Sequence, residues 1–301
     1  MEVDSIIEMF LRSDDKFGVK YRNYIGDGDS KTFAGILKTN PYGDDCPVTK
    51  NECVGHVQKR MGTRLRNMKK AKMLGGKKRL TAGIIKKLTI YYGLAIRRNV
   101  DSVKNMKGAI MATLDHYCST DESPRHENCP VGVDSLCEWR KAESTNELKS
   151  FKHPDRVINE EVEKHILPIY NDLSNDDLLT RCLGGYTQNS NESFNSTIWL
   201  ITPKHLNSGP KIVEIAAYMA TGMFNEGYSA ILRVMQLLSL NIGQQCKMFA
   251  DIAHVQRIDR QNKRQAFSSK EARTARRLEQ IHKNEDFEEV EGLLYGPGIA
   301  D

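Results

Sequence analysis

The sequence has no long hydrophobic run, which excludes one class of protein. None of its apolar stretches approaches the roughly 20 residues that a membrane-spanning helix needs. Residues 1–10 contain three acidic side chains and no Lys or Arg, so they lack the basic start of a secretory signal. We therefore expect no membrane partner, and a protein of the cytosol or nucleus.

The cysteine content argues against a disulfide-stabilised protein. The seven cysteines are an odd number in a chain of 301 residues. Without a secretory signal, this pattern argues against a disulfide framework. The expected roles are reduced structural thiols or metal ligands. The chain is long enough to bury a sizeable core, in one large domain or two smaller ones.

Acidic residues are absent from one long stretch. Between Cys53 and Val100 there are fourteen Lys and Arg residues and no Asp or Glu. A block of one sign creates a positive field that suits polyanions such as DNA. A solvated basic helix face without a partner is the alternative, and the missing acidic residues favour phosphate contact. The residues expected to contact DNA are Lys59, Arg60, Arg64, Arg66, Lys69 and Lys70.

The spacing of apolar residues predicts a mainly helical chain with few strands. A strand is expected over 21–25, and it leads into the turn residues Gly26-Asp-Gly-Asp29. A short helix is expected to follow over 32–37. Gly222 and Gly227 are expected to bend or break the last of the long helices. The long helices are predicted over 80–98, 103–114, 156–173, 174–183 and 211–239, and the two glycines lie in the last of them.

Three acidic residues stand at positions that suit a divalent metal. Asp27 follows the predicted strand in a glycine-flanked turn, and Asp29 is its neighbour. Glu192 opens a predicted helix after an Asn-rich loop, where its carboxylate would lie near the loop. Taken singly, an ordinary Asp-Gly turn and a glutamate that favours the helix dipole are the more common explanations.

A Cys-x-x-His pair lies between these acidic residues. Cys53-Val-Gly-His56 has a spacing that can supply half of a zinc site. Structural packing of the two side chains is the more frequent role of such a lone pair. The pair follows a predicted strand end and precedes the basic helix, which places it between the two candidate carboxylate segments.

The order of these motifs resembles the Mutator-like transposases, over roughly residues 1–250. Asp27, within Tyr24-Ile-Gly-Asp-Gly-Asp-Ser-Lys, matches the family's second aspartate, and Cys53 and His56 match its C/D-x-x-H motif. Glu192, within Gln188-Asn-Ser-Asn-Glu-Ser-Phe-Asn, matches the last carboxylate, beyond a long helical insertion. The resemblance implies an RNase H-like catalytic core of the DDE type, with Mg²⁺ or Mn²⁺ held by Asp27 and Glu192 and with Asp29 as a helper. It also implies DNA cleavage and strand transfer in the nucleus, and leaves homo-oligomerisation open.

One departure from the family concerns its first catalytic aspartate, which lies on an upstream strand. Asp4, Asp14 and Asp15 fall in a predicted helix or loop and do not match that position. The chain therefore resembles an N-terminally truncated core, and catalysis by two metals needs carboxylates that hold both ions. We expect little or no activity from this chain alone. Alternatives are a non-catalytic retained DNA-binding or protein-interaction module, and a zinc-stabilised helical module without a nucleic-acid role.

A polar segment over 116–137 interrupts the helical pattern and is rich in Cys and His. His126-x-x-Cys129, followed by Cys137, has a spacing that suits a zinc site, and His116 or Cys118 could supply the fourth ligand. The alternative is a polar loop with buried thiols. Because the segment is otherwise too polar to order itself, a metal would explain how it folds.

The expected fold class is α/β, with an incomplete RNase H-like core, a large all-helical insertion and a helical C-terminal tail. The core is expected to be split by the insertion into two separate stretches of sequence. The charge pattern changes after about residue 250, which predicts a solvated tail. The expected parts are 1–60 and 184–250 for the core, 61–183 for the insertion with its possible zinc-binding segment, and 251–301 for the tail.

Overall fold

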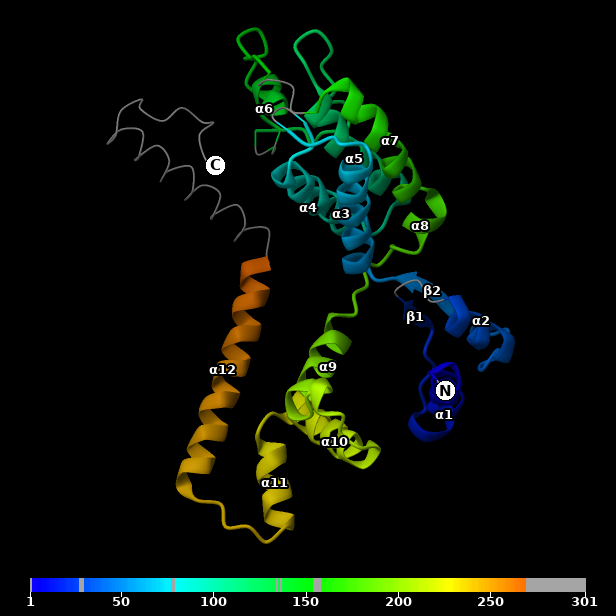
Figure 1. The fold of residues 1–301 in the computed structure, drawn as a ribbon, viewed down its shortest axis with the longest axis vertical. Coiled ribbons are helices and arrows are strands. Elements are labelled where there is room, and N and C mark those ends of the chain that lie inside the picture. Colours follow the sequence, from blue (N-terminus) through cyan, green and yellow to red (C-terminus); the bar gives the residue numbers. More distant parts are fainter. Residues whose placement is uncertain are drawn as a thin grey trace. The chain divides into compact units, whose positions relative to one another are not determined.

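A computed structural model of the chain describes residues 2–26, 30–76, 79–133, 135, 137–153 and 158–268. The described chain is mostly helical and contains one small sheet of two parallel strands (Figure 1). It divides into two compact units, Met1–Ser190 and Asn191–Asp301. Within the described ranges, no helix has both the length and the apolar character needed to cross a membrane. Of the expected α/β fold, the described residues show a mostly helical chain with one small parallel sheet.

The first unit begins with a β-α-β arrangement. Helix α1 (Glu2–Phe17) precedes strand β1 (Asn23–Gly26), and helix α2 (Ser30–Thr39) connects β1 to strand β2 (Thr49–Glu52). The strands pair in parallel with Gly26 opposite Glu52, because the helical crossover returns the chain in the same direction. A small cluster of Phe10, Ile36 and Val48 packs α1 and α2 together. The strand predicted over 21–25 is confirmed with a shift of one or two residues.

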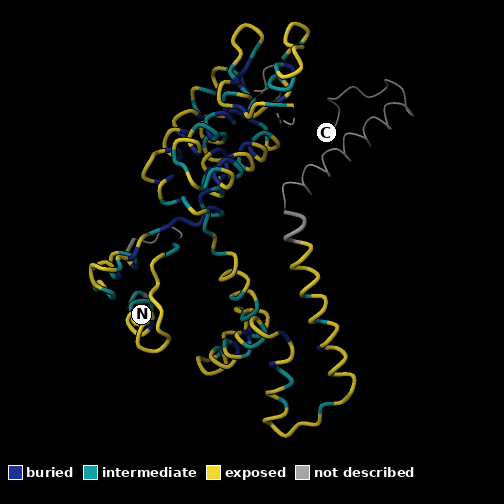
Figure 2. Tube along the Cα trace, turned by 180° about the vertical axis from the view of Figure 1, so that it is seen from behind, coloured by how far each residue is buried: buried dark blue, intermediate teal, exposed yellow. Residues whose placement is uncertain are grey.

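The remainder of the first unit is a helical block that contains the main core (Figure 2). Leu88, Tyr92 and Ile110 are fully buried in it, with side chains from neighbouring helices around them. Such interdigitated burial supplies most of the stability of a helical domain. The block consists of α3 (Val54–Ala71), α4 (Ala82–Arg98), α5 (Val103–Cys118), α6 (Glu138–Ser144), α7 (Glu160–Leu173) and α8 (Asp176–Thr180).

Polar residues at the helix starts explain where these helices begin. The side chains of Thr81 and Ser102 accept hydrogen bonds from the backbone of Ile84 and Asn105, at 3.2 and 3.3 Å. Asn159 and Asn175 cap α7 and α8 in the same way. Each cap satisfies a backbone N–H group that has no partner inside the helix.

Two glycines allow α3 and α4 to approach each other closely. A Cβ atom on Gly62 would lie 2.9 Å from Thr89 Oγ1, and one on Gly93 would lie 2.3 Å from Gln58 Oε1. A side chain at position 62 would crowd the short Thr89 side chain on α4, whereas one at position 93 would displace the flexible end of Gln58. The close contact holds one side of α3 against α4 and leaves its opposite side facing outward.

The second unit consists of helices that bury few large side chains. Its helices are α9 (Asn189–Ile201, which starts two residues before the unit boundary), η1 (Lys204–Leu206), α10 (Pro210–Glu226), α11 (Ser229–Leu237) and α12 (Gln244–Ser268). The helix predicted over 211–239 is divided into α10 and α11 at Gly227, whose φ of 72° requires a glycine-like conformation. Gly222 lies within α10. The part of the predicted tail over 269–301 lies outside the described residues.

Candidate metal centre and nucleic-acid surface

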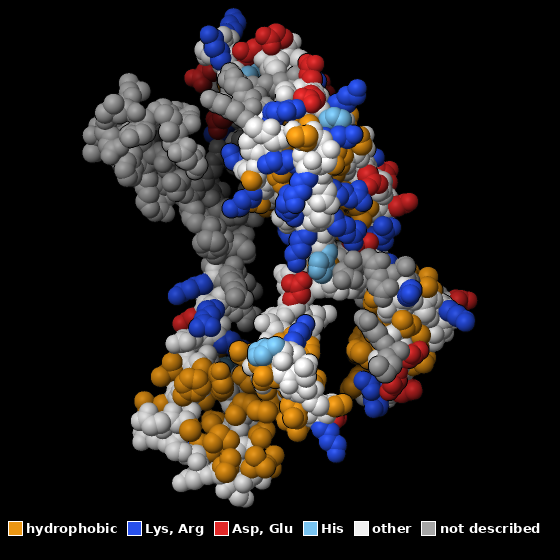
Figure 3. Space-filling model, in the orientation of Figure 1, with side chains coloured by type: hydrophobic (Ala, Val, Ile, Leu, Met, Phe, Trp, Pro, Cys, Tyr) orange, Lys and Arg blue, Asp and Glu red, His pale blue; other side chains and the backbone are white. Residues whose placement is uncertain are grey.

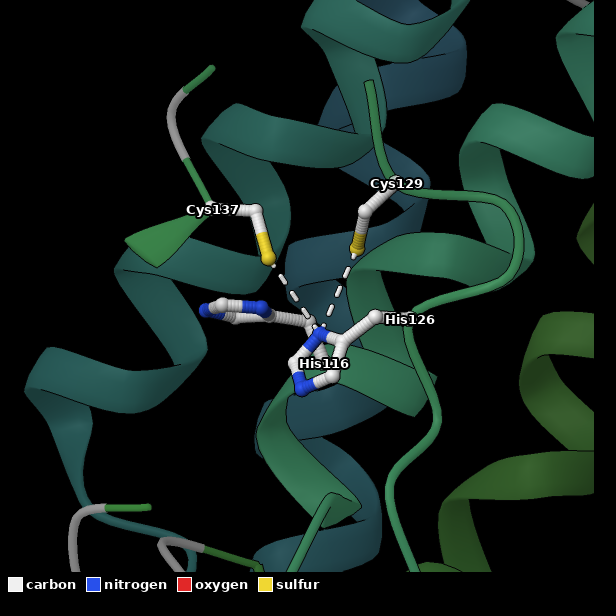
Figure 4. Close-up of side chains that lie close together, drawn as sticks. All are labelled: His116, His126, Cys129 and Cys137. Atoms are coloured by element: carbon white, nitrogen blue, oxygen red, sulfur yellow. Dashed lines mark hydrogen bonds between the residues drawn. The ribbon is translucent and has the colours of Figure 1, made fainter. Parts of the chain in front are cut away.

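Four Cys and His side chains of the first unit meet around one point (Figure 4). The ligand atoms of His116, His126, Cys129 and Cys137 all lie within 4.8 Å of one another. His116 comes from α5, His126 and Cys129 from the loop that follows, and Cys137 from the residue before α6. All four were predicted from the sequence as possible ligands. The fifth predicted candidate, Cys118, lies in the main core and is not part of this group.

The loop that carries the cluster is held by residues of α6. Arg140 donates from Nε to the carbonyl oxygen of His126 and from Nη2 to that of Glu127, both at 2.9 Å. The ring of Trp139 stacks on His126, with centroids 5.0 Å apart and planes 15° apart. The aromatic cover and the Arg140 hydrogen bonds fix the loop backbone beside the thiols. Sequence spacing gave no indication of the role of Arg140.

The protonation states of the cluster suit a metal. His126 Nδ1 lies 3.3 Å from Cys137 Sγ and 3.7 Å from Cys129 Sγ. A hydrogen bond from the Cys129 thiol lowers the pKa of Cys137 well below its usual range and raises the pKa of Cys129. Burial lowers the pKa of the His126 imidazole. Cys137 as a thiolate and His126 as a neutral imidazole are in the forms that bind a metal ion, whereas the Cys129 thiol would release its proton on binding.

A second layer of hydrogen bonds orients the His126 ring. His153 Nδ1 lies 2.7 Å from Asp121 Oδ1, and His153 Nε2 lies 2.9 Å from His126 Nε2. The His153 backbone N–H, with help from the ring, lowers the pKa of Asp121. The ionised carboxylate can accept the Nδ1 proton of His153, and the Ser119 hydroxyl lies 2.9 Å from His126 Nε2 and 3.0 Å from His153 Nε2. His153 and Ser119 therefore hold the far edge of the His126 ring, which keeps its Nδ1 facing the two sulfur atoms.

The predicted basic residues fall into two groups on α3. Lys59, Arg66 and Lys70 are exposed and follow one another at helical spacing along one face. The opposite face contains Val57, Met61 and Leu65, which are fully buried. The exposed face of α3 is therefore the side that packing leaves to solvent. Figure 3 shows Lys and Arg side chains gathered over the helical block to which α3 belongs.

Two of the predicted DNA-contacting arginines are engaged within the chain. Arg60 Nη2 lies 2.5 Å from Glu52 Oε2, and Arg64 pairs with Asp172. Glu52 is 4% exposed at its side chain and also lies 3.4 Å from Arg181 Nε. These ion pairs connect α3 to the end of β2 and to α7, and they connect Glu52 to the residue after α8. Lys69, the remaining predicted residue, is half-buried.

The end of β1 is tied to the chain that returns from the helical block. Gln188 Nε2 donates to the Ile25 carbonyl oxygen at 2.8 Å, and Gln188 N donates to Cys53 Sγ at 3.4 Å. The Cys53 backbone N–H donates in turn to Gly26 O at 3.3 Å. Cys53 therefore lies at a junction of three segments of the first unit. Glu52 and Gln188 form hydrogen bonds at this junction, and neither was predicted from the sequence to have a role there.

Of the three predicted catalytic carboxylates, the structure describes the position of Glu192 alone. Asp27 and Asp29 lie outside the described residues, directly after β1. Glu192 is exposed in the first turn of α9, within the second unit. His56 lies in the first turn of α3, where its backbone N–H donates to Cys53 O at 2.9 Å. The metal-binding role of these carboxylates stays a prediction.

Comparison with known families gives one match, which covers both candidate sites of the first unit. Residues 1–137 match the Mutator-like transposase family model. The resemblance predicted from the motifs is confirmed over these residues. This Mutator-like segment contains Cys53, His56 and the whole of α3, and its last residue is Cys137 of the cluster. Glu192 lies beyond it. No curated protein and no solved structure matches the chain.

Proposed function

We propose that the chain is a transposase-derived DNA-binding protein of the nucleus that holds phosphates along the exposed face of α3. The observation that carries this proposal is the row of Lys59, Arg66 and Lys70 inside the Mutator-like segment. Transposases act on DNA, and a row of cations on a rigid helix matches the regular charge of a DNA backbone.

In this proposal, the buried face of α3 packs within the block and the exposed face binds phosphates. The buried face fixes the helix in the block, and Arg60 and Arg64 anchor its flank through ion pairs with Glu52 and Asp172. The helix therefore does not need to rearrange to present its outer face. A fixed cationic surface loses little conformational freedom when phosphates bind.

We infer that the segments before and after the helical block in the sequence form parts of an RNase H-like core. Support comes from the parallel β1-α2-β2 unit and from the Gln188 bond to Ile25, the residue before Gly26. The family resemblance assigns Asp27 and Glu192 as ligands of Mg²⁺ or Mn²⁺, with Asp29 as a helper. Asp27 follows β1 directly, and Glu192 follows Gln188 by four residues.

We infer that this chain alone does not cut DNA. The acidic residues Asp4, Asp14 and Asp15 all belong to α1, which is a helix and not a strand of the sheet. The family uses three carboxylates to hold two metal ions, and the resemblance assigns two of them in this chain, Asp27 and Glu192. A supercoiled-plasmid assay with Mn²⁺ or Mg²⁺ tests this inference. Nicking that Glu192→Gln abolishes would overturn it.

The His116, His126, Cys129 and Cys137 group is proposed to hold Zn²⁺ as a structural ion. Two thiols and two imidazoles form a donor set that is common in closed tetrahedral zinc sites. The ligands come from α5, the loop and the start of α6, so the ion would cross-link three segments. A zinc-stabilised module that binds no nucleic acid is the second candidate function, and this cluster favours it.

Measurements of DNA affinity distinguish these two functions. The triple variant Lys59→Gln, Arg66→Gln and Lys70→Gln is compared with Lys16→Gln, Lys38→Gln and Lys164→Gln, which removes the same charge from exposed positions elsewhere in the first unit. We expect the first triple variant to weaken binding to a fluorescent duplex by at least tenfold at 100 mM salt, and the control to change it little. Equal losses in both variants would argue for a diffuse charge effect, and no binding by the unmodified chain would favour the zinc module.

A further inference from the structure

A cavity of about 550 Å³ opens beside the metal cluster in the first unit. It lies between the second half of α4, one face of α5 and the loop segment Asn128–Pro130. The cluster residues His116, Cys129 and Cys137 form part of its wall. A volume of this size falls in the range of pockets that hold small organic ligands. Neither the proposed metal role nor the proposed role of α3 uses this cavity.

The charges around the cavity favour an anionic ligand. Arg98, the last residue of α4, and Lys104, in the first turn of α5, both line it and are exposed. No Asp or Glu is among its lining residues, all of which belong to the described ranges. Neither cation forms an ion pair with another described residue. A positive rim without counter-charges is suited to a phosphate group.

The remaining lining residues combine flat aromatic surface with amide groups. Tyr91 is 38% exposed, and its ring stacks on that of Tyr117, with centroids 6.4 Å apart and planes 30° apart. Asn105 and Asn128 are exposed and line the same cavity. An amide side chain offers both a donor and an acceptor, as the edge of a nucleobase does. Aromatic rings provide a surface on which any base can stack.

We propose that this cavity receives one unpaired nucleotide of a DNA strand. The phosphate lies at Arg98 and Lys104, the base stacks on Tyr91, and the amides of Asn105 and Asn128 contact the base edge. The proposal rests on the proposed DNA-binding function and adds a site for a base that has left the duplex. A purely apolar peptide would leave the two cations and the amides without partners, so the lining fits a nucleotide better.

Gly108 provides a way to close the cavity without touching the charged groups. It lines the cavity from α5, and a Cβ atom placed on it would meet only Asn128 Oδ1, at 3.7 Å. The space beside Gly108 is therefore open, and a leucine there would extend into the volume that the base needs. Leucine also has a higher helix propensity than glycine, so α5 should tolerate the change.

The experiment measures binding of the full chain to two duplexes of the same length that share the strand carrying 2-aminopurine and differ in the position opposite it. One is fully paired, and the other carries a single unpaired 2-aminopurine whose fluorescence reports stacking. We expect the unmodified chain to prefer the second duplex by about tenfold and to quench its fluorescence. Gly108→Leu and Tyr91→Leu should remove the preference and the quenching, while affinity for the paired duplex stays the same. Circular dichroism and zinc content confirm that both variants are folded.

The possible results separate this proposal from the proposed function. Equal affinity for the two duplexes in the unmodified chain, with paired-duplex binding still lost in the Lys59, Arg66 and Lys70 variant, would overturn the cavity proposal alone. Binding to neither duplex would overturn the DNA-binding function and the cavity proposal together. The mononucleotide dAMP serves as a further probe, and tighter binding of dAMP than of the unpaired duplex would show a site for free nucleotides and overturn the assignment to DNA.

Discussion

The helical block of the first unit and the helices of the second unit are built from similar amphipathic segments but use them differently. The block places Leu88, Tyr92 and Leu114 almost fully inside its core. In the second unit, Leu237 is 85% exposed and Tyr218 is 70% exposed. Figure 3 shows hydrophobic side chains gathered over part of the visible surface of the second unit. The block therefore closes its own core, whereas the described helices of the second unit leave much of their apolar surface exposed.

This difference indicates where the stability of the chain resides. Complete burial of a large apolar side chain contributes roughly 1.5–3 kcal/mol relative to full exposure. Among the described helical residues of the second unit, the buried side chains are alanines, namely Ala216, Ala220, Ala230 and Ala250. These small residues bring backbones together but bury little area. We therefore expect the block to unfold last, and substitutions in it to have the larger effects.

Loss of the metal is expected to have the largest effect on the block. Cys137→Ser removes one of four ligands and leaves a thiol, two imidazoles and a hydroxyl that cannot hold zinc tightly. We expect metal analysis to find about one zinc ion per chain in the unmodified protein and none in the variant. The melting temperature of the block should fall, and a chelator should reproduce this change in the unmodified protein.

Cys246→Ser is the matched control for this prediction, since Cys246 is exposed in the second unit. Zinc content and melting temperature should not change in this variant. If Cys137→Ser retains the zinc content of the unmodified protein, the four-residue group is not a metal site and the loop is held by hydrogen bonds alone.

Leucine truncations in the two units provide the most direct test of the comparison. Leu88→Ala should lower the free energy of unfolding by about 2–5 kcal/mol, because it removes a fully buried side chain and leaves a cavity. Leu237→Ala should change it by no more than about 0.5 kcal/mol. Urea denaturation followed by circular dichroism measures both. A large loss in Leu237→Ala would show that a partner or another part of the chain covers α11 in solution.

Removing one tyrosine hydroxyl from each unit tests the same difference in burial, with a smaller expected change in stability. Tyr92 donates to the Leu173 carbonyl oxygen at 2.8 Å inside the core, and burial raises the pKa of Tyr92, so its hydroxyl stays neutral. Tyr92→Phe should cost about 1–3 kcal/mol because a buried carbonyl loses its partner. Tyr218→Phe removes an exposed hydrogen bond to Glu214 and should have almost no effect. Equal denaturation midpoints for the two variants would contradict the assigned difference in burial.

The sequence predicted the elements that depend on local patterns. Helical spacing located α4 and α5 to within a few residues, and Gly227 marks the break between α10 and α11 as expected. The Cys and His spacing predicted the cluster but left His116 and Cys118 as alternatives. The choice between them depends on the rotation of α5 against the core, which directs Cys118 inward and leaves His116 beside the loop.

Other parts of the site depend on contacts that no local pattern encodes. His153 and Asp121 meet across 32 positions of sequence, and Gln188 meets Ile25 across 163. The buried Glu52 pairs with Arg60 and Arg181, and its sequence neighbours gave no sign that it would be enclosed. Tertiary packing alone brings these residues together. The same reason explains why the sequence marked all six basic residues as equal, although Arg60 and Arg64 are engaged in ion pairs.

The central claim is that α3 holds DNA phosphates through Lys59, Arg66 and Lys70. The most direct test is the salt dependence of duplex affinity for the unmodified chain and for the triple glutamine variant. Each phosphate contact contributes about 0.9 to the slope of log affinity against log salt concentration, so three lost contacts should reduce the slope by about 2.7. A slope that stays the same in the triple variant would contradict the claim and assign DNA contact to another surface.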